Sequence, residues 1–206
     1  MREYHKIQSI FKRESERPCK IIEGQYSLPE FEYLKNNIWT FTEKVDGTNI
    51  RIMLQDGQLK FGGKTDNASI PVFLYDKLTT IFQVEKLKEK FEDNVCLYGE
   101  GYGAKIQKGG GNYISNGVDF VLFDVKVGEY WLNRNSVEEI AEFLNIKVVP
   151  IIGEGTLQDA IEMTRKGFKS QWGDFIAEGI VARPKTELFA RNGKRIITKI
   201  KYKDFN

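Results

Sequence analysis

The chain has 206 residues, of which 41% are hydrophobic and 29% charged, and its formal net charge is +2 at pH 7. This composition is typical of a globular protein, and so small a net charge does not by itself indicate a nucleic-acid-binding protein. No apolar run reaches transmembrane length, and the first residues lack the apolar core of a secretion signal. We therefore expect a soluble, cytoplasmic protein with no membrane partner, folded as a single domain over residues 1–206.

The cysteines and the histidine argue against several kinds of site. Cys19 and Cys96 form no Cys-x-x-Cys pair, and His5 is the only histidine. Structural zinc sites and histidine-based catalytic triads need more of these residues than the chain has. We expect reduced thiols and no structural zinc.

The first half of the chain alternates between strand and helix patterns. Ser27 and Glu30 have the spacing of a capping box, and Asp56-Gly57 is typical of a type I′ turn. The patterns predict an amphipathic opening and loop over residues 1–26, a helix over 27–36, a β-hairpin over 39–61 and a long helix over 71–91.

The second half is richer in strands. Ser136 and Glu139 predict a capped helix start, and Gly167 predicts a helix end. The patterns predict strands over 95–101, 118–127, 148–152, 175–183 and 195–202, and helices over 135–145 and 156–166. Because tight turns favour antiparallel pairing, we predict an α+β fold of antiparallel β-sheets flanked by helices.

One lysine stands at the mouth of a predicted turn. Lys44 is followed by Asp46-Gly47 between two strand-like runs. A free lysine has a pKa near ~10.4, and lowering it to ~7–8 for nucleophilic attack takes roughly 4 kcal/mol. Neighbouring cations or a metal ion can supply that shift. Lys-x-Asp-Gly also fits a plain charged turn, and average residue usage gives it by chance in about one chain of this size in twenty.

Further charged residues stand in strand-like segments. Lys199 and Lys201 share one face of the last strand, where they fit either phosphate contacts or the protection of a sheet edge. Glu178 lies among apolar residues and needs a metal-bound water or an ammonium as partner. Glu100 lies among glycines, which suits either a turn or hydrogen bonds to ribose. Phe120 and Phe123 fit the core, although one of them could serve as a platform for a purine base.

Five short motifs occur in a fixed order along the chain. They are Lys44-x-Asp46-Gly47, Gly99-Glu100, Phe120-x-x-Phe123-Asp124, Glu178-Gly179-Ile180-Val181 and Lys199-x-Lys201. Together they resemble the covalent nucleotidyltransferase superfamily, which contains ATP-dependent DNA ligases, RNA ligases and mRNA capping enzymes. Thr48-Asn49 is similar to the RNA ligase 2-like branch found in phages and viruses. The resemblance implies the nucleotidyltransferase (ATP-grasp-like) core.

The resemblance also implies a reaction and its cofactors, ATP and Mg²⁺ or Mn²⁺. Lys44 would attack the α-phosphorus of ATP to give lysyl-AMP and pyrophosphate. The AMP would pass to the 5′-phosphate of RNA, possibly at a duplex nick, and a 3′-hydroxyl would then displace it. This activity would serve RNA repair.

Carried over position by position, the resemblance implies a role for each motif residue. Glu178 would hold the hydrated metal ion, and Lys199 and Lys201 would contact the α-phosphate. The expected contacts of the remaining residues are Glu43 with the adenine edge, Asn49 with the water shell of the metal, Lys64 with a nucleic-acid phosphate, Glu100 with the ribose and Phe120 with the adenine ring. Relatives often have an arginine in place of Lys64.

Three alternatives follow from the same residues. The chain could be a DNA ligase, a guanylyltransferase that caps mRNA, or a nucleic-acid-binding relative without catalysis. The chain stops five residues after Lys201, so we expect no appended C-terminal domain. It would then be a minimal ligase, one domain of a larger enzyme, or a protein that seals RNA only with a partner protein or domain.

Overall fold

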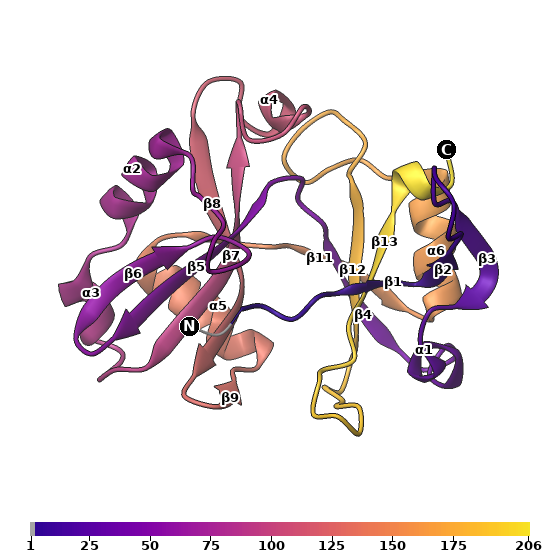
Figure 1. The fold of residues 1–206 in the computed structure, drawn as a ribbon, viewed down its shortest axis with the longest axis horizontal. Coiled ribbons are helices and arrows are strands. Elements are labelled where there is room, and N and C mark those ends of the chain that lie inside the picture. The colour runs from indigo at the N-terminus through magenta and orange to yellow at the C-terminus, as the bar shows by residue number, and fades with distance from the viewer. Residues whose placement is uncertain (1–2) are drawn as a thin grey trace. The chain divides into compact units, whose positions relative to one another are not determined.

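The computed structural model describes residues 3–206, which divide into two compact units (Figure 1). Unit 1 contains residues 3–4 and 46–149, and unit 2 contains residues 5–45 and 150–206. Each unit has its own β-sheet and its own apolar core. Among the described helices, none is long and apolar enough to cross a membrane.

Unit 1 is built on a six-stranded sheet of order β10-β8-β7-β5-β6, with β9 paired to β8. All pairings are antiparallel except that of β10 with β8. The strands are β5 (Thr48–Gln55), β6 (Gln58–Gly62), β7 (Val95–Gly103), β8 (Val118–Val127), β9 (Tyr130–Trp131) and β10 (Lys147–Val148). The helices are α2 (Val72–Ile81), α3 (Val84–Lys88), α4 (Gly110–Tyr113) and α5 (Arg134–Leu144).

The two faces of this sheet differ in chemistry. Alternation along β5 sends Ile50 and Ile52 into the core that the sheet shares with residues of α2, α3 and α5, whereas Asn49 and Arg51 point to the other face. Tyr4 packs on that second face, where its hydroxyl donates to Asp124 Oδ2 at 2.5 Å. One side of the sheet is therefore apolar, and the other carries buried polar groups.

Unit 2 is built on a five-stranded sheet of order β1-β13-β12-β4-β11 and a separate β2-β3 ribbon. The strands are β1 (Gln8–Ser9), β2 (Phe11–Arg13), β3 (Ile21–Tyr26), β4 (Trp39–Glu43), β11 (Ile151–Gly155), β12 (Gly179–Pro184) and β13 (Thr198–Lys201). The helices are α1 (Pro29–Tyr33), α6 (Leu157–Lys166) and the 3₁₀ turn η1 (Tyr202–Asp204). Trp39, Phe41, Ile180 and Ile200 face the core that also buries Leu157 and Ile161 of α6.

The prediction of one hairpin over residues 39–61 was wrong. β4 pairs with β11 and β12 in unit 2, whereas β5 pairs with β6 and β7 in unit 1. The segment that carries Lys44 is therefore a connection between two sheets. Only the turn at Asp56-Gly57, with φ angles of 53° and 69°, is confirmed as a hairpin turn, joining β5 to β6. The strand predicted over 148–152 is divided in the same way, between β10 and β11.

Several predicted boundaries also needed correction. Ser27 does not cap α1, because its hydroxyl donates to the Ser9 carbonyl and the helix begins after Leu28. The helix predicted over 71–91 is broken where Phe82 takes an extended conformation between α2 and α3. Asn133, not Ser136, caps α5.

The two ends of the chain contain other differences, and one prediction there is confirmed. The opening segment forms β1, β2 and β3, because it pairs with β13 and with itself. The last two predicted strands are shorter than expected and start at Gly179 and Thr198. The end of α6 at Gly167 is confirmed.

Gly179 allows β12 and β13 to approach each other closely. A Cβ atom at Gly179, whose φ is +152°, would lie 2.0 Å from the Ile200 carbonyl oxygen. We expect Gly179→Ala to lower the free energy of unfolding by about 2 kcal/mol or more, because backbone cannot move aside cheaply. Gly153→Ala is the control, since its Cβ would meet only the Phe41 ring at 3.6 Å. Urea unfolding measures the free energy of unfolding of both variants. Equal losses of stability in the two would contradict the prediction.

Candidate active site

Three strand ends of unit 2 bring the predicted nucleophile and its partners together. Lys44 follows β4, Glu178 precedes β12, and Lys201 ends β13. The Lys44 amide donates to the Gly179 carbonyl at 2.9 Å, and Gly179 is the register partner of Lys201. Because β12 lies between β4 and β13, the three side chains meet at one end of the sheet.

The carboxylate of Glu178 bridges two ammonium groups. Lys44 Nζ lies 2.7 Å from Glu178 Oε2, and Lys201 Nζ lies 2.7 Å from Oε1. The side chains of Lys44, Glu178 and Lys201 are only 19%, 12% and 21% exposed. Limited access to water strengthens these charge-assisted hydrogen bonds and orders all three groups. An ammonium was one of the two kinds of partner expected for Glu178, and the structure places two of them at its carboxylate.

The cluster carries a net positive charge and a single carboxylate. Among the described residues, no group of three or more acidic, histidine or cysteine side chains could hold a metal ion. A magnesium ion, however, keeps much of its water shell and needs only one or two carboxylates besides substrate phosphates. Glu178 therefore fits a hydrated ion of this kind and does not fit a cage made entirely of protein ligands.

Lys199 lies one alternation step along β13 from Lys201. Its register partners are Val181 on β12 and Ser9 on β1. Its neighbours in sequence, Thr198 and Ile200, are buried on the opposite side, so the predicted shared face of the two lysines is confirmed.

The Glu43 side chain is buried beneath a loop of unit 2. The side chain is 1% exposed, accepts from the Ser170 hydroxyl at 2.5 Å and accepts from the Gln171 amide at 2.8 Å. The Trp172 amide in turn donates to the Ser170 hydroxyl at 3.1 Å. Burial raises the pKa of the Glu43 carboxyl, and the hydrogen bonds from Gln171 and Ser170 partly offset the rise. The Glu43 side chain thus binds the loop at Ser170 and Gln171. For contact with a base edge, this leaves the backbone of Glu43.

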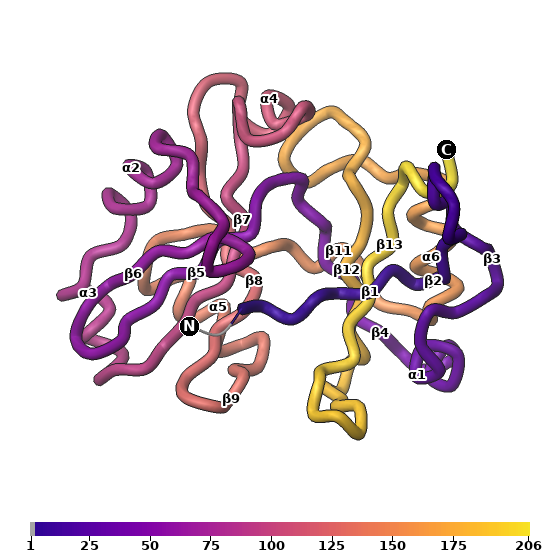
Figure 2. Tube along the Cα trace, viewed as in Figure 1, coloured from indigo at the N-terminus to yellow at the C-terminus, as the bar shows by residue number. Residues whose placement is uncertain are grey.

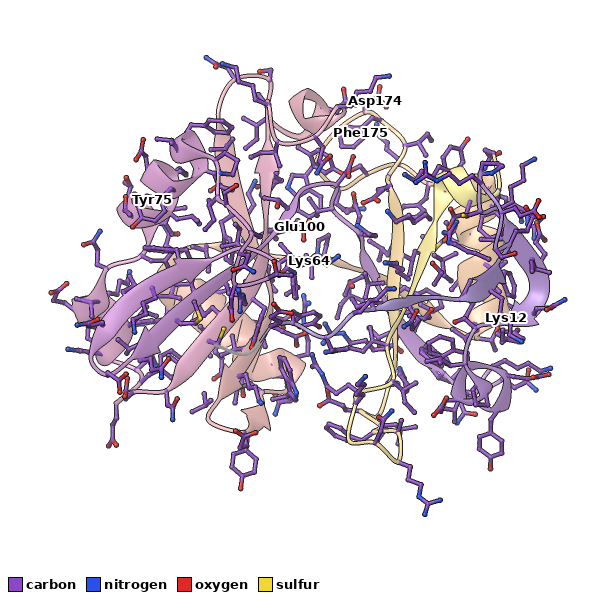
Figure 3. All side chains as sticks on the ribbon, viewed as in Figure 1. Lys12, Lys64, Tyr75, Glu100, Asp174 and Phe175 are labelled. Carbon is purple, nitrogen blue, oxygen red and sulfur yellow. The ribbon has the colours of Figure 1, made fainter. Side chains whose placement is uncertain are left out.

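Unit 1 holds a second group of predicted residues. Asn49 on β5 and Glu100 on β7 are register partners, so their side chains leave the sheet side by side (Figure 3 labels Glu100). A Cβ atom at Gly47 would lie 2.3 Å from the Gly101 carbonyl oxygen and 2.8 Å from Glu100 Cγ. The glycine of the Lys-x-Asp-Gly motif is therefore required by close approach to β7.

The structure places Phe120 in the apolar core of unit 1. The ring is 1% exposed and meets Phe82 edge-on at 5.3 Å, and a Cβ atom at Gly99 would lie 2.1 Å from it. A ring packed in this way presents no open face to a base. The described structure therefore gives Phe120 a packing role and does not support the predicted stacking on adenine.

Lys64 lies in an ordered loop that follows β6. Its side chain is exposed, whereas the neighbouring Arg51 is fully buried (Figure 3 labels Lys64). Arg51 Nε donates to the Gly63 carbonyl at 2.8 Å, and Arg51 Nη2 lies 2.9 Å from Asp66 Oδ1. One buried guanidinium thus holds the loop on both sides of Lys64.

Comparison with known proteins identifies the family. A family model described as RNA ligase matches residues 37–202. The chain belongs to the RNA ligase family. No curated protein sequence matches it.

Solved structures of the Naegleria gruberi RNA ligase have a similar fold. The form with PPi is 22% identical with a TM-score of 0.65, and the match covers 84% of this chain and 52% of that one. A variant with ATP and Mn is 19% identical with a TM-score of 0.68, over 98% and 63% of the two chains. This family member therefore spans about half to two thirds of the solved ligases it matches, and the predicted α+β nucleotidyltransferase fold is confirmed.

Sequence reasoning missed two buried residues of this RNA ligase family member. Ser170 binds Glu43, and Arg51 binds the loop of Lys64. A signal was available for both pairs, because both are charged residues within strands. Glu43 shares the inward face of β4 with Trp39 and Phe41, and Arg51 lies within the apolar run of β5. A buried charge of this kind requires a partner, although the sequence does not say which residue supplies it.

The raised pKa of Glu43 predicts a pH-dependent stability. A group whose pKa is raised on folding contributes full stability below its ordinary value of 4.5 and loses that contribution as the pH rises through the folded value. Glu43→Gln keeps the acceptor oxygen but cannot ionise. We therefore expect the free energy of unfolding of the wild type, minus that of Glu43→Gln, to fall as the pH rises from 4.5.

Urea unfolding between about pH 4.5 and pH 8 measures this difference. Glu154→Gln is the control of opposite sign, because the hydrogen bond from Lys185 lowers the pKa of Glu154. Its difference should rise with pH, and only slightly, since the Glu154 carboxylate is exposed. A flat or rising difference for Glu43→Gln would contradict the assignment.

Proposed function

We propose that the chain is an ATP-dependent RNA ligase that acts through a lysyl-AMP intermediate on Lys44. The observation that carries the proposal is the Lys44–Glu178–Lys201 cluster, in which an amine, a carboxylate and a second cation are held within hydrogen-bond distance. Membership of the RNA ligase family supports the substrate class. The Naegleria gruberi ligases solved with ATP and Mn, and with AMP and Mn, support the cofactors.

In the first step Lys44 Nζ attacks the α-phosphorus of ATP. The ammonium first gives up one proton to water, then a nitrogen–phosphorus bond forms and the bond to the bridging oxygen breaks. Pyrophosphate leaves with its electron pair, and the nitrogen loses a second proton to water. Glu178 favours the charged form of Lys44 while the two are in contact, so the carboxylate must be diverted before the amine can react. A magnesium or manganese ion held by Glu178 through water would provide that diversion and would polarise the α-phosphate.

The remaining cations stabilise the charge that develops on phosphorus. Lys199 and Lys201 contact the α-phosphate, and Lys201 also orients the pyrophosphate, because phosphoryl transfer depends mainly on positioning and charge neutralisation. In unit 1, Glu100 binds the ribose and Asn49 orders the water shell of the ion. The shared register of Asn49 and Glu100 supports a common site for these two.

In the later steps AMP moves from Lys44 to an RNA 5′-phosphate, and the RNA 3′-oxygen then displaces it. Lys64 contacts a phosphate of the RNA. The contacts of the buried Arg51 with Gly63 and Asp66 support this assignment, because they order the loop without using the Lys64 ammonium. The chain spans 52% of the length of a solved relative. We therefore propose that complete sealing is carried out either by this chain alone or by this chain together with a partner protein or domain.

Self-adenylation tests the proposed function directly. Incubation with α-labelled ATP and Mg²⁺ should attach label that survives SDS, because the phosphoramidate bond is covalent. Lys44→Ala should abolish the label, and Glu178→Gln should lower its rate of formation by about 100-fold or more. Lys203→Ala is the control, since that lysine is exposed just beyond the cluster.

The same assay separates the alternative reactions. Labelled GTP in place of ATP tests for cap transfer, and RNA-containing against all-DNA nicks tests for DNA ligation. Loss of label on addition of 5′-phosphorylated RNA supports the proposal. Wild-type protein that takes up no label would contradict it.

A further inference from the structure

The connection between β12 and β13 is an ordered hairpin. Figures 1 and 2 show it extending from the ends of the two strands, and we call its residues, 185–197, the arm. Backbone hydrogen bonds close it from Ala190 N to Lys194 O at 2.8 Å and from Ile196 N to Leu188 O at 2.9 Å. The arm is thus a hydrogen-bonded continuation of β12, which follows Glu178, and of β13, which ends at Lys201.

The base of the arm is anchored by burial. The Arg195 side chain is 1% exposed and pairs with Glu187 at 3.1 Å. Leu188, Ala190 and Ile196 pack on the apolar core of unit 2. Because both sides of the hairpin are fixed in this way, the residues at its tip keep a defined position relative to the sheet of that unit.

The arm presents an exposed aromatic ring next to its base and two exposed cations at its tip. Phe189 is 54% exposed, and Arg191 and Lys194 are also exposed. Within residues 3–206, neither of these two cations forms an ion pair. The only acidic residue of the arm, Glu187, is neutralised by Arg195. The tip therefore carries uncompensated positive charge beside an accessible ring.

We propose that the arm binds the RNA substrate, with Arg191 and Lys194 on phosphates and Phe189 stacked on a base. This inference rests on the proposed function. Cations that follow a backbone and an aromatic ring that receives a base are the usual elements of single-strand binding. A protein partner fits less well, because stable protein interfaces bury more than about 1,000 Å² and one ring offers only a fraction of that area.

The arm contacts RNA at a distance from the reacting phosphate. Lys194 and Lys201 are seven residues apart on one side of the hairpin, which at ~3.3 Å per residue places the tip at most about 23 Å from the cluster. With a nucleotide spacing of ~3.4 Å along a strand, this corresponds to about seven nucleotides. The arm should therefore matter for long RNA and not for very short RNA, and it takes no part in self-adenylation.

Two variants of the full chain test the arm. They are Phe189→Ala and the double variant Arg191→Ala/Lys194→Ala, and Lys12→Ala/Lys20→Ala removes the same charge from exposed positions elsewhere in unit 2 (Figure 3 labels Lys12). For AMP transfer to 5′-phosphorylated RNA of about 15 nucleotides, each arm variant should raise KM by about tenfold, with kcat close to that of the wild type. RNA of about four nucleotides should show no change.

Two further readouts separate binding from folding and from catalysis. Affinity for labelled RNA should lose about two units of salt slope in the double variant, since each phosphate contact contributes about one unit. Phe189→Leu, which keeps an apolar side chain, should behave as Phe189→Ala because it lacks the ring. The rate of lysyl-AMP formation should stay unchanged in all variants, which also shows that they fold.

The outcomes distinguish this inference from the proposed function. Absence of wild-type lysyl-AMP overturns the proposed function. Normal lysyl-AMP formation with unchanged KM and RNA affinity in both arm variants overturns the role of the arm, as does an equal effect on short RNA or in the Lys12/Lys20 control. Binding of a protein partner in place of RNA at the arm would likewise overturn it.

Discussion

The contact on which the active site depends is the carboxylate of Glu178 between the ammonium groups of Lys44 and Lys201. A carboxylate shared by two cations holds each of them in place, and the low exposure of all three side chains strengthens the arrangement. Two ammonium groups around one carboxylate give the cluster a net positive charge, which suits a site for an anionic substrate. The arrangement exists because three strands end together, and their spacing at that end relies on Gly179, where no side chain fits.

Each unit also buries one charged side chain next to a proposed functional residue. In unit 2, Glu43 precedes Lys44 and fastens the loop at Ser170. In unit 1, Arg51 fastens the loop that carries Lys64. Burial of a charge is costly unless hydrogen bonds compensate it, so neither residue is explained by stability alone. Both are explained if each of these loops must keep one conformation, since short charge-assisted bonds restrict a loop more tightly than apolar contacts do.

The sequence was sufficient to predict the family and the residues of the cluster, and less sufficient to predict the strand pairing. The residues of the cluster could be predicted because lysines and a glutamate stand in strand-like segments where apolar residues would be expected. The hairpin around Lys44 could not be recognised as a connection, because two adjacent strands with a tight turn look the same whether they pair with each other or with different sheets. Phe120 was ambiguous for a related reason: the strand pattern does not show which face a ring takes, and the contact with Phe82 decides it. Tertiary packing determines that Ser170 is the partner of Glu43 and that Asp66 is a partner of Arg51. A local sequence pattern contains no information about such packing.

The Lys-x-Asp-Gly motif spans the boundary between the two units. Lys44 belongs to unit 2, where its amide is bound by the Gly179 carbonyl, whereas Asp46 and Gly47 belong to unit 1. There the Asp46 amide donates to the Tyr113 hydroxyl at 3.0 Å, and the Gly47 carbonyl accepts from Gln107 at 3.0 Å. Within four residues the backbone is therefore bound by β12 of unit 2 and by the Tyr113 and Gln107 side chains of unit 1. The backbone is thus held on both sides of Val45, while the Lys44 side chain contacts Glu178. The glycine follows from the same constraint, because the chain must enter unit 1 against the backbone of β7, where a Cβ atom has no room.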